Sequence, residues 1–139
     1  MLKAKLISFV ATRFPERALN FYSKILGLTL QNYDPAAMVF EANGTMLRVQ
    51  RVRELVPASH TVLGWEVPDI VAMIQELTMK GVRFERPEGL IQDELGVWIS
   101  PSGSKVAWFK DPDGNTLSLT ELNGQAIGQV KLGEGKAAA

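Results

Sequence analysis

Few residues in this sequence are spaced in a way that could support catalysis. The one histidine is His60, and the sequence contains no cysteine. If residues 60–66 are extended, alternation puts His60 and Glu66 on the same face, where an imidazole and a carboxylate could share a metal ion or a proton. Ser118 and Tyr22 have no histidine or aspartate at a spacing typical of a catalytic triad, and no glycine-rich phosphate loop is present. The sequence therefore predicts no catalytic residue.

Composition and charge exclude several classes of protein. The 139 residues include fifteen Lys+Arg, fifteen Asp+Glu and 46% apolar residues, as in one ordinary globular domain. The absence of cysteine excludes disulfides, Cys-type zinc sites and iron–sulfur clusters. A net charge of zero argues against nucleic-acid binding. Alternation separates Arg48 from Arg51 and Arg53, so this cluster is interpreted as a solvated sheet edge.

The first residues carry no recognisable targeting signal. The apolar stretch after Lys5 is short and soon meets Arg13 and Pro15, which fits neither a signal peptide nor a membrane span. We expect a cytoplasmic protein without a membrane partner.

Hydrophobic periodicity predicts the elements that must position any site. A strand over residues 6–12 is followed by a helix that opens at Pro15 and ends before Gly27. Glycine suits that end because it adopts the left-handed conformation. Three more strands are predicted at 28–33, 38–41 and 45–52. Asn43-Gly44 joins the last two and is a strong hairpin signal.

The same order of elements begins again after a linker at residues 53–59. A strand at 61–67 precedes a helix with Asp69 as its N-cap and Gly81 at its end. Strands are then predicted near residues 82–86, 96–100, 105–110 and 116–121. Because Gly27 and Gly81 lie 54 positions apart, we predict a tandem repeat of two β-α-β-β-β modules.

These elements predict one α+β domain over residues 1–122. Its modules span about 4–53 and about 60–122. Residues 123–139 are rich in glycine and are predicted to form a flexible C-terminal tail.

Two segments carry a resemblance to a known family. They are Phe21-Tyr22-Ser23-Lys24-Ile25-Leu26-Gly27-Leu28 and Val106-Ala107-Trp108-Phe109-Lys110-Asp111-Pro112-Asp113-Gly114-Asn115. In this order on a duplicated chain they resemble the vicinal oxygen chelate superfamily, which includes glyoxalase I, extradiol dioxygenases, fosfomycin resistance enzymes and bleomycin resistance proteins. The resemblance covers residues 4 to 122 approximately. It implies that eight strands form a cup-shaped mixed sheet, with the helices outside and a ligand pocket inside.

Both motifs are explained by packing and turn geometry, so they carry no chemistry of their own. Phe21, Tyr22 and Ile25 recur at helical spacing, and Pro112 and Gly114 suit a tight turn. Function must therefore be inferred from the pocket.

Metal-dependent members of the family place His or Glu ligands at four strand positions. The resemblance puts these positions at Ile7, Arg48, Val62 and Ser118, or at Gln50 in place of Arg48. Alkyl groups offer no lone pair and a guanidinium is always cationic, so this donor set does not suit a divalent ion. We predict no bound metal and no other cofactor. The alternative is a rearranged site that uses His60 and Glu66.

The resemblance also indicates which side chains would line the pocket. If Val62 and Ser118 face the cup, alternation buries their neighbours Trp65, Leu117 and Leu119 under the helices. The residues predicted to bind a ligand are Ile7, Phe9, Arg48, Gln50, Val62, Glu66, Trp98, Trp108, Ser118 and Thr120. Such a wall is mostly apolar with a few polar groups, which is typical of a small-molecule site.

Two features of this lining remain open at the level of sequence. Arg48 could bind a carboxylate or phosphate of a ligand, or it could neutralise Glu41 or Glu66 within the protein. Trp98 and Trp108 could stack on an aromatic ligand or belong to the core.

The sequence thus predicts a glyoxalase/bleomycin-resistance-like protein that binds a small organic molecule without metal. One alternative is a lyase or dioxygenase-like enzyme with a rearranged metal site or metal-free acid/base chemistry. The other is a non-catalytic interaction domain. We also predict a homodimer, because exposed sheet edges need covering.

Overall fold

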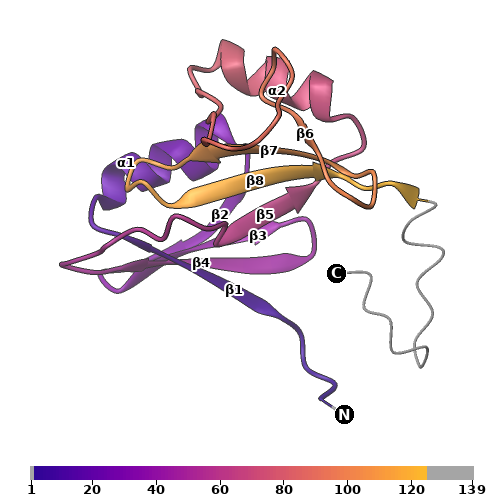
Figure 1. Ribbon diagram of the computed structural model, residues 1–139. Helices are drawn as coiled ribbons and strands as arrows, with labels where there is room; N and C mark the ends of the chain where they lie inside the picture. Colours follow the sequence, from indigo (N-terminus) through magenta and orange to yellow (C-terminus); the bar gives the residue numbers. More distant parts are fainter. Residues whose placement is uncertain (1, 125–139) are drawn as a thin grey trace. The chain divides into compact units, whose positions relative to one another are not determined.

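The computed structural model describes residues 2–124 (Figure 1). Strand, helix and three further strands follow one another twice, as predicted. The chain forms two compact units. The first comprises the residues up to Leu63 together with Lys110–Leu117, and the second comprises Gly64–Phe109 with the residues from Ser118 onward. Residues 125–139, most of the predicted tail, lie outside the described residues.

The first unit contains a four-stranded mixed sheet. Its strands are β1 (Ile7–Thr12), β2 (Thr29–Tyr33), β3 (Ala37–Ala42) and β4 (Thr45–Arg51). They lie in the order β1-β4-β3-β2, with β1 parallel to β4. The predicted hairpin between β3 and β4 is present, and its turn has φ of 51° at Asn43 and 96° at Gly44. Both values lie in the left-handed region that a type I′ turn needs.

The first helix packs on one face of this sheet. It consists of α1 (Pro15–Asn20), which continues directly into the π-helical turn η1 (Phe21–Ile25). The Tyr22 ring lies 6.0 Å from the Phe40 ring of β3, centroid to centroid. Phe40 pairs with Leu47 of β4, so both side chains belong to the helix-covered face.

The second unit repeats this arrangement. Its elements are β5 (Leu63–Glu66), α2 (Ile70–Met79), β6 (Trp98–Ile99), β7 (Lys105–Lys110) and β8 (Thr116–Glu121), and the strand order is β5-β8-β7-β6. At the ends of these strands, four residues are counted with the first unit, namely Leu63, Lys110, Thr116 and Leu117. Asp69 caps α2 as predicted, because its carboxylate accepts a hydrogen bond from the amide of Ala72 at 3.0 Å. The side chain of Glu121 accepts another from the amide of Ile70 at 3.0 Å, which ties β8 to the start of α2.

The predicted strand at residues 82–86 is not a strand of the sheet. It forms a single bridge, between Phe84 and Phe109, while β6 pairs further along the same edge of β7. Between the two pieces, the amide side chain of Gln92 donates to the carbonyl oxygens of Glu85 and Gly96. These bonds hold the chain in a loop between the two short pieces. The prediction was therefore wrong here, because local periodicity does not reveal such side-chain bonds.

The turn between β7 and β8 belongs to the first unit and holds it together. Asp111 accepts a hydrogen bond from the hydroxyl of Tyr22 at 2.7 Å. Asp113 accepts from the hydroxyl of Thr12 at 2.5 Å, from the amide of Arg13 at 2.8 Å and from Nε of Arg13 at 3.1 Å. Both aspartates are buried, so these partners compensate for the loss of water.

Tyr22 is kept as a hydrogen-bond donor by its surroundings. Burial, followed by the negative charge of Asp111, raises the pKa of its hydroxyl far above the ordinary range. The hydroxyl therefore stays protonated near neutral pH and donates to Asp111.

We predict that Asp113→Ala destabilises the protein by about 3 kcal/mol, because the buried partners of the carboxylate lose their acceptor. Asp113→Asn keeps one acceptor oxygen and should cost less. Urea unfolding at neutral pH measures both free energies. Glu54→Ala, at an exposed acidic residue outside this network, is the control, and equal effects of Asp113→Ala and Glu54→Ala would refute the structural role of Asp113.

Candidate functional site

The predicted ligand-binding residues on β1 and β4 share one face of the first sheet. Phe9 pairs with Arg48, and Ala11 pairs with Gln50, between the parallel strands β1 and β4. Residues paired in this way point to the same side, and successive pairs two residues apart do so too. Ile7 therefore lies on this face as well. It is the face opposite to Phe40 and Leu47, and we call it the first open face.

The first open face exposes large apolar side chains. The exposed fractions are 45% for Ile7, 55% for Phe9 and 38% for Met46, which pairs with Ile7. Solvated strands usually present polar side chains. An apolar strand face of this kind is able to hold an apolar molecule.

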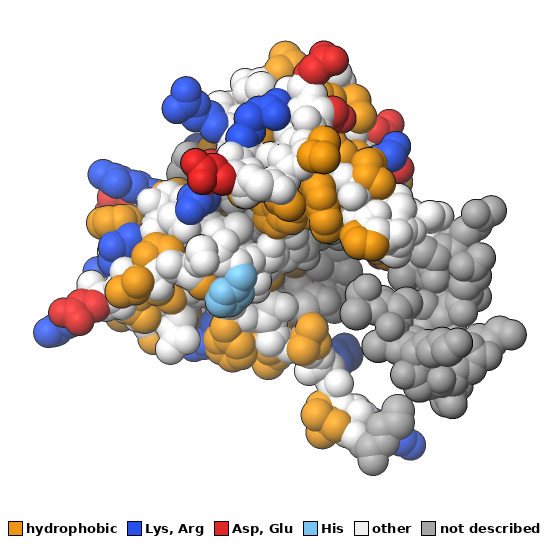
Figure 2. Space-filling view, viewed as in Figure 1, with side chains coloured by type: hydrophobic (Ala, Val, Ile, Leu, Met, Phe, Trp, Pro, Cys, Tyr) orange, Lys and Arg blue, Asp and Glu red, His pale blue; other side chains and the backbone are white. Residues whose placement is uncertain are grey.

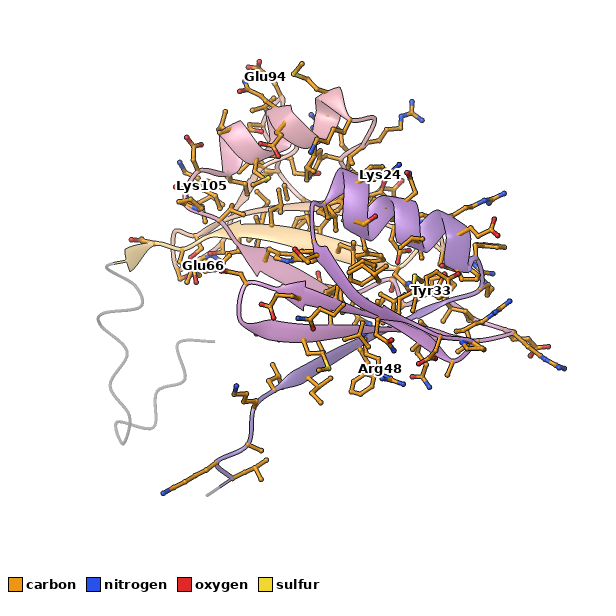
Figure 3. The ribbon with its side chains drawn as sticks, turned by 180° about the vertical axis from the view of Figure 1, so that it is seen from behind. Lys24, Tyr33, Arg48, Glu66, Glu94 and Lys105 are labelled. Atoms are coloured by element: carbon orange, nitrogen blue, oxygen red, sulfur yellow. The ribbon has the colours of Figure 1, made fainter. Side chains whose placement is uncertain are left out.

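Arg48 is the charged group in the middle of this face. Figure 3 shows its side chain on the side of the sheet away from α1. Its direct neighbours across the strands are Phe9 and Val39. Among the described residues of the first unit, no carboxylate lies within ion-pair distance of its guanidinium. Glu41, one predicted internal partner, instead accepts a hydrogen bond from the amide of Gly44.

The positive charge of Arg48 acts on the carboxyl group of Asp34. The amides of Ala36 and Ala37 hold the pKa of the Asp34 carboxyl below its usual range, and the positive charge of Arg48 lowers this pKa further. Asp34 is thus already satisfied by backbone donors at 2.8 and 3.0 Å. The sequence identified Asp34 only as a turn residue, because its electrostatic interaction with Arg48 depends on how the strands come together in space.

In the second unit, the predicted residues also lie on the face turned away from the helix. Glu121 reaches α2 from β8, so Leu119, two residues earlier, points to the helix side and is buried. Ser118 consequently points to the opposite side, which we call the second open face. A Cβ added to Gly64 would lie 2.6 Å from Oγ of Ser118, so Gly64 faces the same way.

Trp98 and Trp108 form a pair on the second open face. Their ring centroids are 5.8 Å apart with an interplanar angle of 38°. Trp98 pairs with Val106, and Trp108 shares the side of Val106 on β7. Both indoles are half-buried. They lie outside the helix-side core of the second unit and present part of their surface to solvent.

The remaining predicted residues are mostly accessible. Gln50 and Glu66 are exposed, and Thr120 is half-buried. Val62 is 39% exposed and donates its amide to the carbonyl oxygen of Thr116. Their positions are compatible with ligand contact, which stays a prediction for every one of these residues.

The positions that the family uses for metal ligands do not suit a metal here. Ile7 and Val62 have alkyl side chains, Arg48 is a cation, and Ser118 offers one weak neutral oxygen. In the part of the chain that the structure describes, no three His, Asp or Glu side chains come together in a way that could hold an ion. His60 is exposed in the segment before β5. No helix within residues 2–124 is long and apolar enough to cross a membrane.

Comparison with known proteins gives a consistent picture of the fold. A family model described as "Glyoxalase/Bleomycin resistance protein/Dioxygenase superfamily" matches residues 7–119. No curated protein matches the sequence. A lactoylglutathione lyase from Agrobacterium tumefaciens superposes with a TM-score of 0.67 at 16% identity, covering 86% of this chain and 94% of that one.

Two further proteins of known structure are described as binding antibiotics. An antibiotic binding protein from Streptomyces sp. CB03234 gives a TM-score of 0.64 at 20% identity, covering 88% of this chain and 100% of that one. A bleomycin-binding protein complexed with bleomycin gives a TM-score of 0.67 at 18% identity, covering 87% of this chain and 100% of that one. At such identities these likenesses show the fold alone.

The close approach of Gly64 to Ser118 gives a test of the second open face. Gly64→Ala should lower the free energy of unfolding by about 1 to 2 kcal/mol, because the Ser118 hydroxyl must move. In a Ser118→Ala background, Gly64→Ala should lower the free energy of unfolding by a smaller amount. The difference, which is the coupling energy between the two positions, should be about 1 kcal/mol. Urea unfolding of the four proteins measures this coupling. Gly124→Ala, where nothing lies within 4 Å of an added Cβ, is the control. An equal cost of Gly64→Ala in both backgrounds would contradict the assigned face.

Proposed function

We propose that this chain, which belongs to the glyoxalase/bleomycin resistance protein/dioxygenase superfamily, binds a small organic molecule on its first open face and holds no resident metal. The observation that supports this most directly is Arg48, a cation without an ion-pair partner in the first unit, set among exposed apolar side chains. Such a combination suits a molecule with an apolar body and one acidic group.

The energetics of this face favour binding over an internal role for Arg48. Covering apolar surface contributes about 25 cal/mol per Å², so the exposed parts of Ile7, Phe9 and Met46 supply affinity without selectivity. A guanidinium forms paired hydrogen bonds with a carboxylate, sulfonate or phosphate, and these fix the orientation of the bound molecule. Arg48 would therefore provide the selectivity.

Catalysis has less support from the described residues. A lyase or dioxygenase mechanism would need a Lewis acid or a positioned acid/base group, and the donor set at the four family positions does not provide it. An interaction domain is the other alternative, and a half-buried cation without an ion-pair partner in the first unit favours a small acidic ligand over it. A homodimer and a cytoplasmic location belong to the same proposal and rest on the sequence alone.

Arg48→Met tests the proposed role of the cation. The probe is anilinonaphthalene sulfonate, an anionic aromatic molecule that fluoresces in apolar surroundings. We expect the variant to bind it more weakly by about 1.5 to 3 kcal/mol, the range for a charged hydrogen bond, while the free energy of unfolding changes little. Methionine keeps the apolar stem, so the loss reports the charge.

The control for this experiment is Arg53→Met, which removes an exposed arginine outside the strands. Uncharged anilinonaphthalene should bind the natural protein and Arg48→Met equally. If Arg48→Met instead unfolds more easily and binds the sulfonate unchanged, Arg48 is an internal structural partner and the proposed site is wrong.

The metal-free part of the proposal is tested by elemental analysis after dialysis against nickel, zinc, manganese or iron in turn. We expect no stoichiometric metal, because a cation at these positions would lose water without compensation and lie near the charge of Arg48. One tightly held equivalent that disappears in His60→Ala or Glu66→Ala would establish the rearranged metal site instead.

A further inference from the structure

An open cleft lies on the first unit, on the opposite side of the sheet from Arg48. It has a volume of 340 Å³ and is lined by Arg13, Phe14, Pro15, Glu16, Arg17 and Arg51. Arg51 pairs with Thr12, whose hydroxyl faces the helix side, so its side chain points away from the first open face. Basic side chains gather at the left-hand edge of Figure 2, over the start of α1. We call this the basic cleft.

The sequence brings these residues together at the point where two strands end. Parallel pairing places Arg51, the last residue of β4, beside Thr12, the last residue of β1. The amide of Val52 then donates to the carbonyl oxygen of Thr12 at 2.9 Å. The amide of Phe14 donates to the Thr12 hydroxyl at 3.0 Å, which turns the chain from β1 into α1. Three arginines therefore converge from β4, from the connection and from α1.

Arg13 is held in place by the protein itself. Its Nε donates to Asp113 Oδ1 at 3.1 Å, and one terminal nitrogen donates to the carbonyl oxygen of Asp113 at 2.8 Å. A guanidinium has five N–H donors, so three remain available. Because its position is already fixed, a ligand that uses these donors does not have to order this side chain.

Arg17 and Arg51 carry positive charges that no carboxylate neutralises directly. Neither forms an ion pair or a side-chain hydrogen bond within the described residues. Glu16 is the acidic residue in the lining, and Asp113 offsets the charge of Arg13. Arg17 and Arg51 thus remain without a carboxylate partner, while Glu16 reduces the net positive charge of the lining.

Phe14 gives the cleft an apolar surface and orients two of the cations. The guanidinium carbons of Arg13 and Arg17 each lie 5.0 Å from the centroid of its ring, within the range of a cation–π contact. The ring is 37% exposed. A volume of 340 Å³ exceeds what a bare oxyanion needs and lies in the range of small-molecule sites.

We propose that the basic cleft binds a small organic phosphate monoester. Near neutral pH such a group carries a charge of about −1.5 to −2, which matches the two guanidinium groups without a carboxylate partner. Its oxygens accept paired hydrogen bonds from Arg17, Arg51 and the remaining donors of Arg13. The organic part rests against Phe14. This site is independent of the proposed ligand on the first open face.

Isothermal titration calorimetry at constant ionic strength tests the proposal with phenyl phosphate and inorganic phosphate as probes. We expect saturable binding of both, with phenyl phosphate the tighter. Arg17→Gln and Arg51→Gln should each weaken binding by about tenfold or more, as expected for the loss of a charged hydrogen bond. Arg53→Gln, a neighbouring exposed arginine outside the lining, should leave binding unchanged.

Two more variants separate the contributions of charge and ring. Glu16→Gln should tighten the binding of both probes, because it removes the negative charge in the lining. Phe14→Leu should reduce the preference for phenyl phosphate over inorganic phosphate. Circular dichroism and urea unfolding confirm that each variant is folded.

The proposal is wrong if neither probe binds saturably, or if inorganic phosphate still binds the Arg17→Gln/Arg51→Gln double variant. It is also wrong if phenyl phosphate still binds that double variant when Arg48→Gln is added to remove the cation of the first open face. Loss of phenyl phosphate binding in Arg48→Gln, with the double variant unaffected, would place the ester on the first open face. That outcome would overturn the basic cleft and leave the proposed function standing.

Discussion

The structure of the first unit depends on two buried carboxylates that must be satisfied without water. Asp111 and Asp113 lie in one turn, and their partners lie on Tyr22, Thr12 and Arg13. The turn therefore fixes the end of β1, the start of α1 and the depth at which Tyr22 enters the core. Removal of one partner from such a network leaves a buried charge uncompensated, so each of these bonds contributes strongly to the stability of the first unit.

The basic cleft and the first open face use the two sides of the same strand. Arg48 and Arg51 are three positions apart on β4, and a strand turns such residues to opposite faces. Alternation predicted this separation, and it also predicted Leu119 under the helix and Ser118 on the other side. Hydrophobic patterning specified these faces because a slip of one residue would exchange every buried side chain for an exposed one.

Interactions between residues far apart in sequence could not be predicted in this way. Tyr22 and Asp111 are separated by 89 positions, and no local pattern links them. Asp34 was identified only as a turn residue, although its carboxyl is influenced by Arg48. The cleft was missed for a similar reason, because it forms where β1 and β4 end side by side. Propensity and periodicity describe neighbours along the chain, whereas these sites are formed by neighbours in space.

The participation of Lys110–Leu117 in the first unit also sets the order in which the protein can be completed during synthesis. Thr12 leaves the ribosome about a hundred residues before its acceptor Asp113. At translation rates of about 5 to 20 residues per second, that delay lasts roughly 5 to 20 seconds. Through this interval the sheet of the first unit has formed no bonds to its final turn. During this interval the end of β1 and the start of α1 therefore lack the hydrogen bonds of the turn, whose residues have not yet been made.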